Sequence, residues 1–266
     1  MIGIFDSGIG GLTVVQSIME QLPSYDIIYF GDTARTPYGT KSPETVIKYA
    51  LEAVEFLIEN GAQVIIIACN TASSTAFKSI TKVYDIPVFE VISPAVELSV
   101  EKTEKNYIGI IGTRATVNSN IYEKKIKEIR PEANVYSYAC PLLVPLVEEG
   151  WFNRPETRMI IKKYLHPLKV RQIDTLILGC THYPLLKKII QNKIGKKVII
   201  VDSSLGVAQK IKIFLAQHPE LDTRMGKNKK ALFFVSDITV QFEKIASLIL
   251  KRKISLKQAV IKSYLR

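Results

Sequence analysis

Two cysteines stand at equivalent places in two similar segments of the chain. Residues 63–71 read Gln-Val-Ile-Ile-Ile-Ala-Cys-Asn-Thr, and residues 174–182 read Asp-Thr-Leu-Ile-Leu-Gly-Cys-Thr-His. In each, an apolar run typical of a buried strand leads to a cysteine, Cys69 or Cys180, and then to a helical pattern. A helix N-terminus favours the thiolate of a nearby cysteine, so both positions suit acid–base or nucleophilic chemistry. A single cysteine there would more often be a small buried side chain, but two in equivalent places favour function.

Polar residues also follow other predicted strands. Asp6 opens the segment Asp-Ser-Gly-Ile-Gly-Gly, whose glycines would let backbone N–H groups approach an anion, although a tight turn explains them equally well. The segment lacks the last glycine of a dinucleotide fingerprint. His182 is one of three histidines and lies two residues from Cys180, where it is a candidate proton partner. Glu148 follows an apolar stretch, which by itself suggests only a solvated helix residue. Cys140, before Pro141, is a weaker candidate.

The elements that would position these residues alternate along the chain. Strands are predicted near 2–5, 27–30, 64–68, 88–91, 107–111, 135–139, 175–178, 198–201 and 231–235. Helices are predicted near 12–22, 43–60, 71–83, 116–129, 155–165, 184–192, 205–216 and 238–250. Strands that are apolar throughout are typical of parallel sheets covered on both faces, so the fold class is α/β. The repeated cysteine segment indicates two similar units, with a boundary near Ile92 to Pro94, where Ser-Pro interrupts the pattern.

Composition excludes several classes of protein. With 266 residues and 47% hydrophobic residues, the chain is long enough for a substantial core. Its longest apolar runs fall far short of the roughly 18 residues that a transmembrane helix needs. The first residues show no signal-peptide pattern, and three cysteines are too few for a disulfide scaffold. These features predict a cytoplasmic protein.

The formal charge of +11 belongs to one part of the chain. Residues 187–266 contain 18 Lys and Arg against 5 Asp and Glu, whereas residues 1–186 contain 18 against 20. The lysines alternate with apolar residues at helical spacing, which indicates a solvated outer helix face. A weak attraction for polyanions is the alternative, but no nucleic-acid-binding motif accompanies the charge, so nucleic acid is an unlikely partner.

Five segments together resemble the glutamate racemase family, whose members form D-glutamate for peptidoglycan without a cofactor. They are Asp-Ser-Gly-Ile-Gly-Gly at 6–11, Thr-Pro-Tyr-Gly at 36–39, Ala-Cys-Asn-Thr-Ala-Ser at 68–73, Val-Pro-Leu-Val-Glu at 144–148 and Gly-Cys-Thr-His-Tyr-Pro at 179–184. The resemblance keeps this order along essentially the whole chain. It implies a racemase of glutamate that needs neither cofactor nor metal.

The resemblance also implies roles for individual residues. To invert Cα, one group must remove a proton from one face of the substrate while another returns a proton to the opposite face. The family pattern gives these roles to Cys69, which acts on D-glutamate, and Cys180, which acts on L-glutamate. It places Asp6 as a helper at Cys69, with His182 and Glu148 as helpers at Cys180. The expected substrate-binding residues are Asp6, Ser7, Tyr38, Gly39, Asn70, Thr71, Thr181 and His182.

The family fold implies two α/β domains with the active site in the cleft between them. Carried over to this chain, residues 1–92 with 207–266 form the domain that contains Cys69, and residues 93–206 form the domain that contains Cys180. A homodimer is expected from the same resemblance. Three alternatives stay open: a racemase of aspartate or another small acid, a basic nucleic-acid-binding protein with inert cysteines, and a redox pair whose Cα atoms would lie roughly 4.4–6.8 Å apart.

Overall fold

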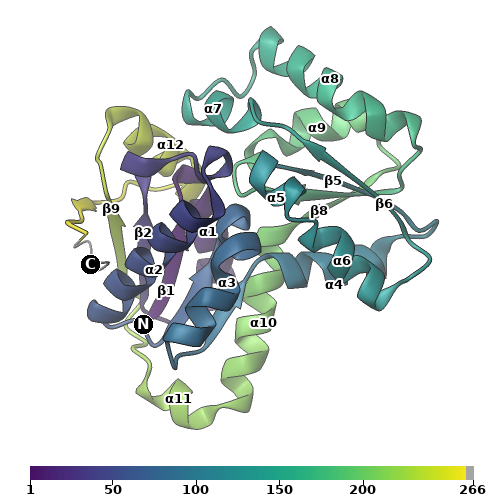
Figure 1. The fold of residues 1–266 in the computed structure, drawn as a ribbon. Coiled ribbons are helices and arrows are strands. Elements are labelled where there is room, and N and C mark those ends of the chain that lie inside the picture. The colour runs from purple at the N-terminus through teal and green to yellow at the C-terminus, as the bar shows by residue number, and fades with distance from the viewer. Residues whose placement is uncertain (262–266) are drawn as a thin grey trace.

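The computed structural model describes residues 1–261, which form two parallel β-sheets flanked by helices (Figure 1). The strands are β1 (Ile2–Asp6), β2 (Ile27–Gly31), β3 (Val64–Ile67), β4 (Val88–Glu90), β5 (Tyr107–Gly112), β6 (Asn134–Ala139), β7 (Thr175–Gly179), β8 (Ile199–Asp202), β9 (Ala231–Val235) and β10 (Leu256–Gln258). The helices are α1 (Leu12–Gln21), α2 (Pro43–Glu59), α3 (Asn70–Val83), α4 (Ile92–Lys102), α5 (Arg114–Asn118), α6 (Ile121–Ile129), α7 (Leu143–Glu148), α8 (Pro155–Val170), α9 (Lys187–Ile194), α10 (Ser203–Gln217), α11 (Pro219–Arg224) and α12 (Val240–Leu250). Short 3-10 turns include Tyr38–Thr40 and Tyr183–Leu186.

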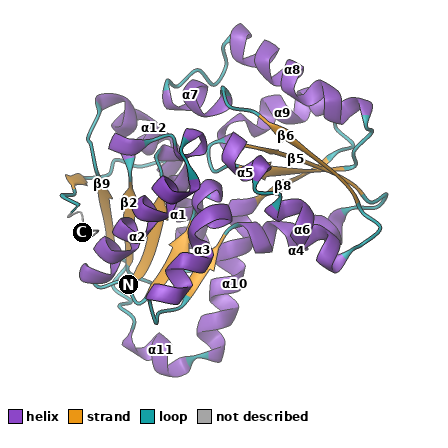
Figure 2. Ribbon diagram, in the orientation of Figure 1, coloured by secondary structure: helices purple, strands orange, loops and turns teal. Residues whose placement is uncertain are grey.

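The two sheets confirm the predicted fold class of two parallel α/β units. The larger sheet has the strand order β10-β9-β2-β1-β3-β4, and the smaller has the order β6-β5-β7-β8. All neighbouring strands are parallel. Helices surround both sheets (Figure 2). Because β9 and β10 pair beside β2, the C-terminal strands complete the sheet that the N-terminal strands begin.

The chain crosses between the two sheets twice, through α4 after β4 and through α10 after β8. The helix α4 packs against α6, β7 and β8 of the smaller unit, and α10 packs against both α4 and α1. We therefore propose that the domains divide near residues 92 and 207, with α10 shared along the junction. Residues 262–266 of the expected first domain lie outside the described residues.

Several predicted elements differ from those of the structure. No helix was predicted between residues 91 and 107, but α4 lies there and contains Pro94 as its third residue, where a missing N–H removes no helical bond. The single helix predicted over 116–129 is two helices, separated at Asn120, which has a left-handed backbone with φ of 53°. Helix α8 extends five residues beyond its predicted end to Val170. The elements α7, α11 and β10 are short and were not predicted from the sequence.

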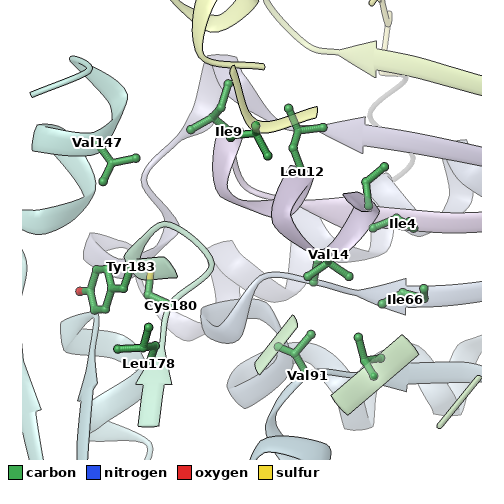
Figure 3. Close-up of a cluster of buried hydrophobic side chains, with 14 of the residues drawn as sticks. Ile4, Ile9, Leu12, Val14, Ile66, Val91, Val147, Leu178, Cys180 and Tyr183 are labelled. Carbon is green, nitrogen blue, oxygen red and sulfur yellow. The ribbon is translucent and has the colours of Figure 1, made fainter. Parts of the chain in front are cut away.

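The core is continuous between the two units. One cluster of buried side chains contains Ile4, Leu12 and Ile66 of the first unit together with Leu178 and Tyr183 of the second (Figure 3). A second cluster lies between the larger sheet and helices α2 and α3, and a third lies on one face of the smaller sheet. Shared apolar burial therefore fixes the two sheets relative to each other beneath the cleft. Within residues 1–261, no helix is long and apolar enough to cross a membrane.

Candidate active site

The two cysteines lie at the carboxyl ends of central strands in the two sheets. Cys69 follows β3 and is the N-cap residue of α3, while Cys180 directly follows β7. The carboxyl edge of a parallel sheet is the usual place for ligand sites, because loops there lead into helix N-termini. The equivalence of the two segments is incomplete, however. Cys180 leads into the 3-10 turn Tyr183–Leu186 and not directly into an α-helix, so the helix-dipole argument applies to Cys69 alone.

A single cavity of about 10 Å³ is lined by both cysteines. Besides them, its lining includes all but one of the residues expected to bind substrate: Ser7, Tyr38, Gly39, Asn70, Thr71, Thr181 and His182. Asp6, the remaining one, is fully buried behind this lining and hydrogen-bonds to it through Thr181. Pro37, Thr113 and Val144 also line the cavity and were not predicted. Cys140 is buried outside it, and all three cysteines are free thiols.

On one side of the cavity, Cys180 contacts an imidazole that is paired with a carboxylate. The Cys180 Sγ atom lies 3.7 Å from Nδ1 of His182, and Nε2 of His182 lies 2.6 Å from Oε1 of Glu148. Burial by itself would lower the pKa of His182, but its contacts with Cys180 and Glu148 outweigh burial and raise that pKa well above the ordinary value. Burial opposes the charge of Glu148 too, yet its hydrogen bond with His182 leaves the pKa of Glu148 lowered. The pair is therefore ionised near neutral pH, with a cation beside Cys180.

On the other side of the cavity, Cys69 lies near a carboxylate. The Sγ atom of Cys69 is 3.5 Å from Oγ of Ser7. Burial and the charge of Asp6 raise the pKa of Cys69 to about 12. Asp6 accepts hydrogen bonds from the backbone N–H of Gly8 at 2.9 Å and from Thr181 Oγ1 at 3.1 Å, yet burial raises its own pKa. The two thiols therefore have different surroundings: Cys69 lies near a buried carboxyl group, and Cys180 lies beside an imidazole that is paired with a carboxylate.

Replacing Asp6 tests this asymmetry. We expect Asp6→Asn to lower the pKa of Cys69 from about 12, because it removes a nearby negative charge and leaves the burial of the thiol unchanged. The rate of Cys69 alkylation by iodoacetamide, followed against pH by peptide mass spectrometry, reports that pKa. Asp26→Asn is a matched control, because Asp26 is also a buried carboxylate but binds the backbone N–H groups of Asn228 and Lys230. An unchanged alkylation profile in Asp6→Asn would show that Cys69 does not experience the Asp6 charge.

Hydrogen bonds join the two units across the cleft. The Thr71 and Thr113 hydroxyls are 2.9 Å apart, and Tyr122 donates its hydroxyl proton to Oδ1 of Asn70 over 2.6 Å.

Close approach of the two units also explains one glycine of the segment 6–11. A Cβ atom on Gly10 would lie 2.5 Å from Oγ1 of Thr181, which real Cβ atoms do not tolerate. Gly10 therefore allows the loop that carries His182 to lie against the first turn of the other unit.

Sequence reasoning missed the group that holds Tyr38 in place. The Tyr38 hydroxyl donates to Oδ2 of Asp32 over 2.5 Å, so its proton is already engaged by a carboxylate. Asp32 is fully buried and also accepts from Arg35 and from Ser236, which follows β9. The sequence showed only a polar loop at 32–39 and gave no sign that residue 236 would reach it. Pairing of β9 with β2 makes this contact possible.

The fold and this geometry define a class: a two-domain parallel α/β protein with a pair of opposed thiols in its interdomain cleft. Comparison with known proteins gives the family. Residues 2–208 match the model of the Asp/Glu/hydantoin racemase family. The chain therefore belongs to this family, and within it to the glutamate racemases.

Individual relatives agree with this assignment over nearly the full chain. Glutamate racemase of Neisseria meningitidis serogroup A is 47% identical over 94% of this chain and 93% of its own length. The crystal structure of glutamate racemase isoform RacE1 from Bacillus anthracis superposes with a TM-score of 0.92 at 38% identity, covering 98% of this chain and 97% of its own. The crystal structure of the Francisella tularensis glutamate racemase in complex with D-glutamate superposes with a TM-score of 0.91 at 40% identity, covering 99% of this chain and 98% of its own.

Proposed function

We propose that this protein interconverts L-glutamate and D-glutamate by proton transfer at Cα, with Cys69 and Cys180 as the two acid–base groups. The observation that supports this most is the pair of thiols that line one cavity from separate domains. Inversion requires a base on one face of the substrate and an acid on the other. Groups that line a cavity from two different domains can lie on opposite walls and so reach both faces.

The surroundings of the thiols suggest which thiol acts as the base and which as the acid for each enantiomer. The imidazolium of His182, held by Glu148, would stabilise a thiolate at Cys180 and donate to it through Nδ1. The buried Asp6 disfavours a thiolate at Cys69. With Cys180 as the base and Cys69 as the acid, the enzyme removes the Cα proton of L-glutamate and returns one from the opposite side. After that turnover the roles are exchanged, and the enzyme is set for D-glutamate.

The same cavity offers donors for the substrate carboxylates. Helix α3 begins at Asn70, and its first two residues, Asn70 and Thr71, line the cavity, where an anion is stabilised by the helix N-terminus. Ser7, Thr181 and the backbone of Gly39 supply further donors. Asp6, buried behind Thr181, is the carboxyl group that acts on Cys69, and movement of the lining would let it accept a hydrogen bond from the ammonium group. Because a Cα proton is weakly acidic, most of the catalysis must come from stabilisation of the carbanion in this closed, dry cavity.

Deuterium exchange tests the proposed reaction. We expect purified protein, incubated with L-glutamate in deuterated water without pyridoxal phosphate, to remove the optical rotation while deuterium enters Cα, as followed by NMR. Aspartate, the alternative substrate, is one methylene shorter. Preference for a substrate with one more methylene is worth about 1–3 kcal/mol in a fitted pocket, so aspartate should react at least tenfold more slowly. Absence of both signals with glutamate would reject the proposed function.

We infer the cellular setting from the family. D-Glutamate made by this protein would supply peptidoglycan synthesis in the cytoplasm. We also propose that the chain acts as a homodimer. Sedimentation at the concentrations used for assays tests the homodimer, and a single species of about 30 kDa would contradict it.

A further inference from the structure

The cavity between the thiols is too small to admit its substrate without movement. Its volume of about 10 Å³ is roughly that of one water-sized probe, far below the space that an amino acid needs. Both thiols are 5% exposed. Substrate must therefore enter by separation of the two units, and the route is set by whichever contact closes the cavity from solvent.

An outer cavity of about 540 Å³ adjoins this inner cavity. Gly39 lines both. On the second unit, Thr113 lines the inner cavity and the next residue, Arg114, lines the outer one. On α3 the inner lining at Thr71 continues one turn later into the outer lining at Ser74. The outer cavity is therefore the mouth of the inner cavity, built on the same three segments.

Gly39 and Thr113 are in contact where the two cavities adjoin. A Cβ atom on Gly39 would lie 2.4 Å from Cβ of Thr113, so these residues are in tight contact across the cleft. Thr113 is itself fixed, because its hydroxyl bonds to those of Thr71 and Thr116. Separation of the domains would break this contact and connect the mouth with the thiols.

The mouth carries positive charge from both domains. Lys41 follows the 3-10 turn Tyr38–Thr40 of the first unit, and Arg114 is the first residue of α5 in the second. The N-terminus of the 17-residue helix α2 also reaches it at Pro43 and adds a positive helix dipole. No aspartate or glutamate is among the described residues that line the mouth; Glu44, in the first turn of α2, is exposed outside it.

We propose that Lys41 and Arg114 form an anion-capture site that attracts the dicarboxylate substrate to the mouth before the domains open. The inference rests on the proposed function, whose substrate has two carboxylates and one ammonium and is therefore a net anion at neutral pH. A cleft lined by one sign of charge raises the local concentration of an oppositely charged ligand and its rate of entry. The site acts on entry and not on the proton-transfer steps.

Kinetics of charge-removing variants test the capture site. We expect Lys41→Gln and Arg114→Gln each to lower kcat/KM about threefold, and the double variant about tenfold, with kcat unchanged, at low ionic strength. The fall must be equal for L- and D-glutamate, because the equilibrium constant of racemisation is one. It should disappear near 1 M salt, where the Debye length is about 3 Å.

Matched variants remove the same charges elsewhere. Lys82→Gln changes an exposed lysine in the last turn of α3, and Arg158→Gln changes an exposed arginine on α8. Both should retain the kcat/KM of the parent protein and its salt dependence. If the mouth variants and these controls had equal kcat/KM values, the capture site would be overturned, since the change in net charge alone would then explain any effect.

A second measurement does not depend on racemase activity. Iodoacetate is an anionic alkylating agent of thiols, and iodoacetamide is its neutral analogue. We expect Lys41→Gln and Arg114→Gln to slow alkylation of the cavity thiols by iodoacetate while leaving the iodoacetamide rate unchanged, with peptide mass spectrometry assigning the site. If glutamate is not turned over but this ratio changes, the capture site stands and the proposed function fails. If glutamate is turned over and the ratio does not change, the capture site fails alone.

Discussion

We expect Cys69→Ala and Cys180→Ala each to abolish racemisation of both enantiomers of glutamate while the protein stays folded. A positioned acid–base group contributes about 10²–10⁴-fold, and inversion needs both groups in each direction, so the loss should be at least about 10²-fold. Each thiol is a small member of a buried apolar cluster at a strand end beside the cavity, so removal of one sulfur should leave both sheets folded. Polarimetry gives the rate, and circular dichroism gives the fold.

Deuterium exchange in the same variants distinguishes the two thiols. A protein with one thiol left can still remove a proton from one face of the substrate and return deuterium to that same face. We therefore expect Cys69→Ala to exchange the Cα proton of L-glutamate without inversion, through Cys180, and Cys180→Ala to do so with D-glutamate, through Cys69. Exchange with the opposite enantiomers would reverse the assignment of faces.

Cys140 supplies the matched control for these variants. It is buried like the other two cysteines but does not line the cavity, and its backbone carbonyl accepts a hydrogen bond from Tyr183. Cys140→Ser should therefore retain racemase activity. Racemisation at the parental rate in either alanine variant, or loss of activity in folded Cys140→Ser, would contradict the two-thiol mechanism.

The sequence predicted the parts of this molecule that local pattern determines. The apolar runs before Cys69 and Cys180 form central strands β3 and β7, because such runs are stable only when both faces of a sheet are covered. Since the carboxyl ends of parallel strands are the usual ligand edge, the cysteines were expected at the site. Local pattern did not predict the helix that contains Pro94. Proline fits a helix without loss of a hydrogen bond only within the first turn, and the sequence did not show where that turn begins.

Contacts between segments far apart in sequence were beyond local pattern. Asp32 accepts from Ser236, 204 positions away, only because β9 joins the first sheet. Thr113 reaches Thr71 because two separate domains meet there. Glu148 illustrates the same limit, since its surroundings suggested a solvated helix residue and only the family pattern gave it a role. Its partner is set by the packing of α7 beside the loop after β7.

The last prediction concerns the ion pair between His182 and Glu148. We expect Glu148→Gln to lower kcat/KM about 10²-fold and to move the alkaline limb of its pH profile to lower pH. With the carboxylate removed, His182 keeps its contact with Cys180 but loses the hydrogen bond and the charge of Glu148, so its raised pKa must fall and the imidazolium beside Cys180 is lost at a lower pH than in the parent protein. The fall must be equal for both enantiomers because their equilibrium constant is one.

Stability should change with pH in a related way. The raised pKa of His182 contributes stability that is fully present below its ordinary value of 6.5 and is lost as pH rises through the raised pKa. The lowered pKa of Glu148 contributes stability that is present above its ordinary value of 4.5 and is lost as pH falls through the lowered pKa. Both contributions are complete between these two values, so thermal unfolding should show the largest difference between parent and Glu148→Gln in that window.

Glu149→Gln makes the same change at the adjacent, exposed residue and should alter neither activity nor unfolding. A parental alkaline limb in folded Glu148→Gln would mean that the carboxylate does not hold the proton of His182, and Cys180 would then need another source of positive charge.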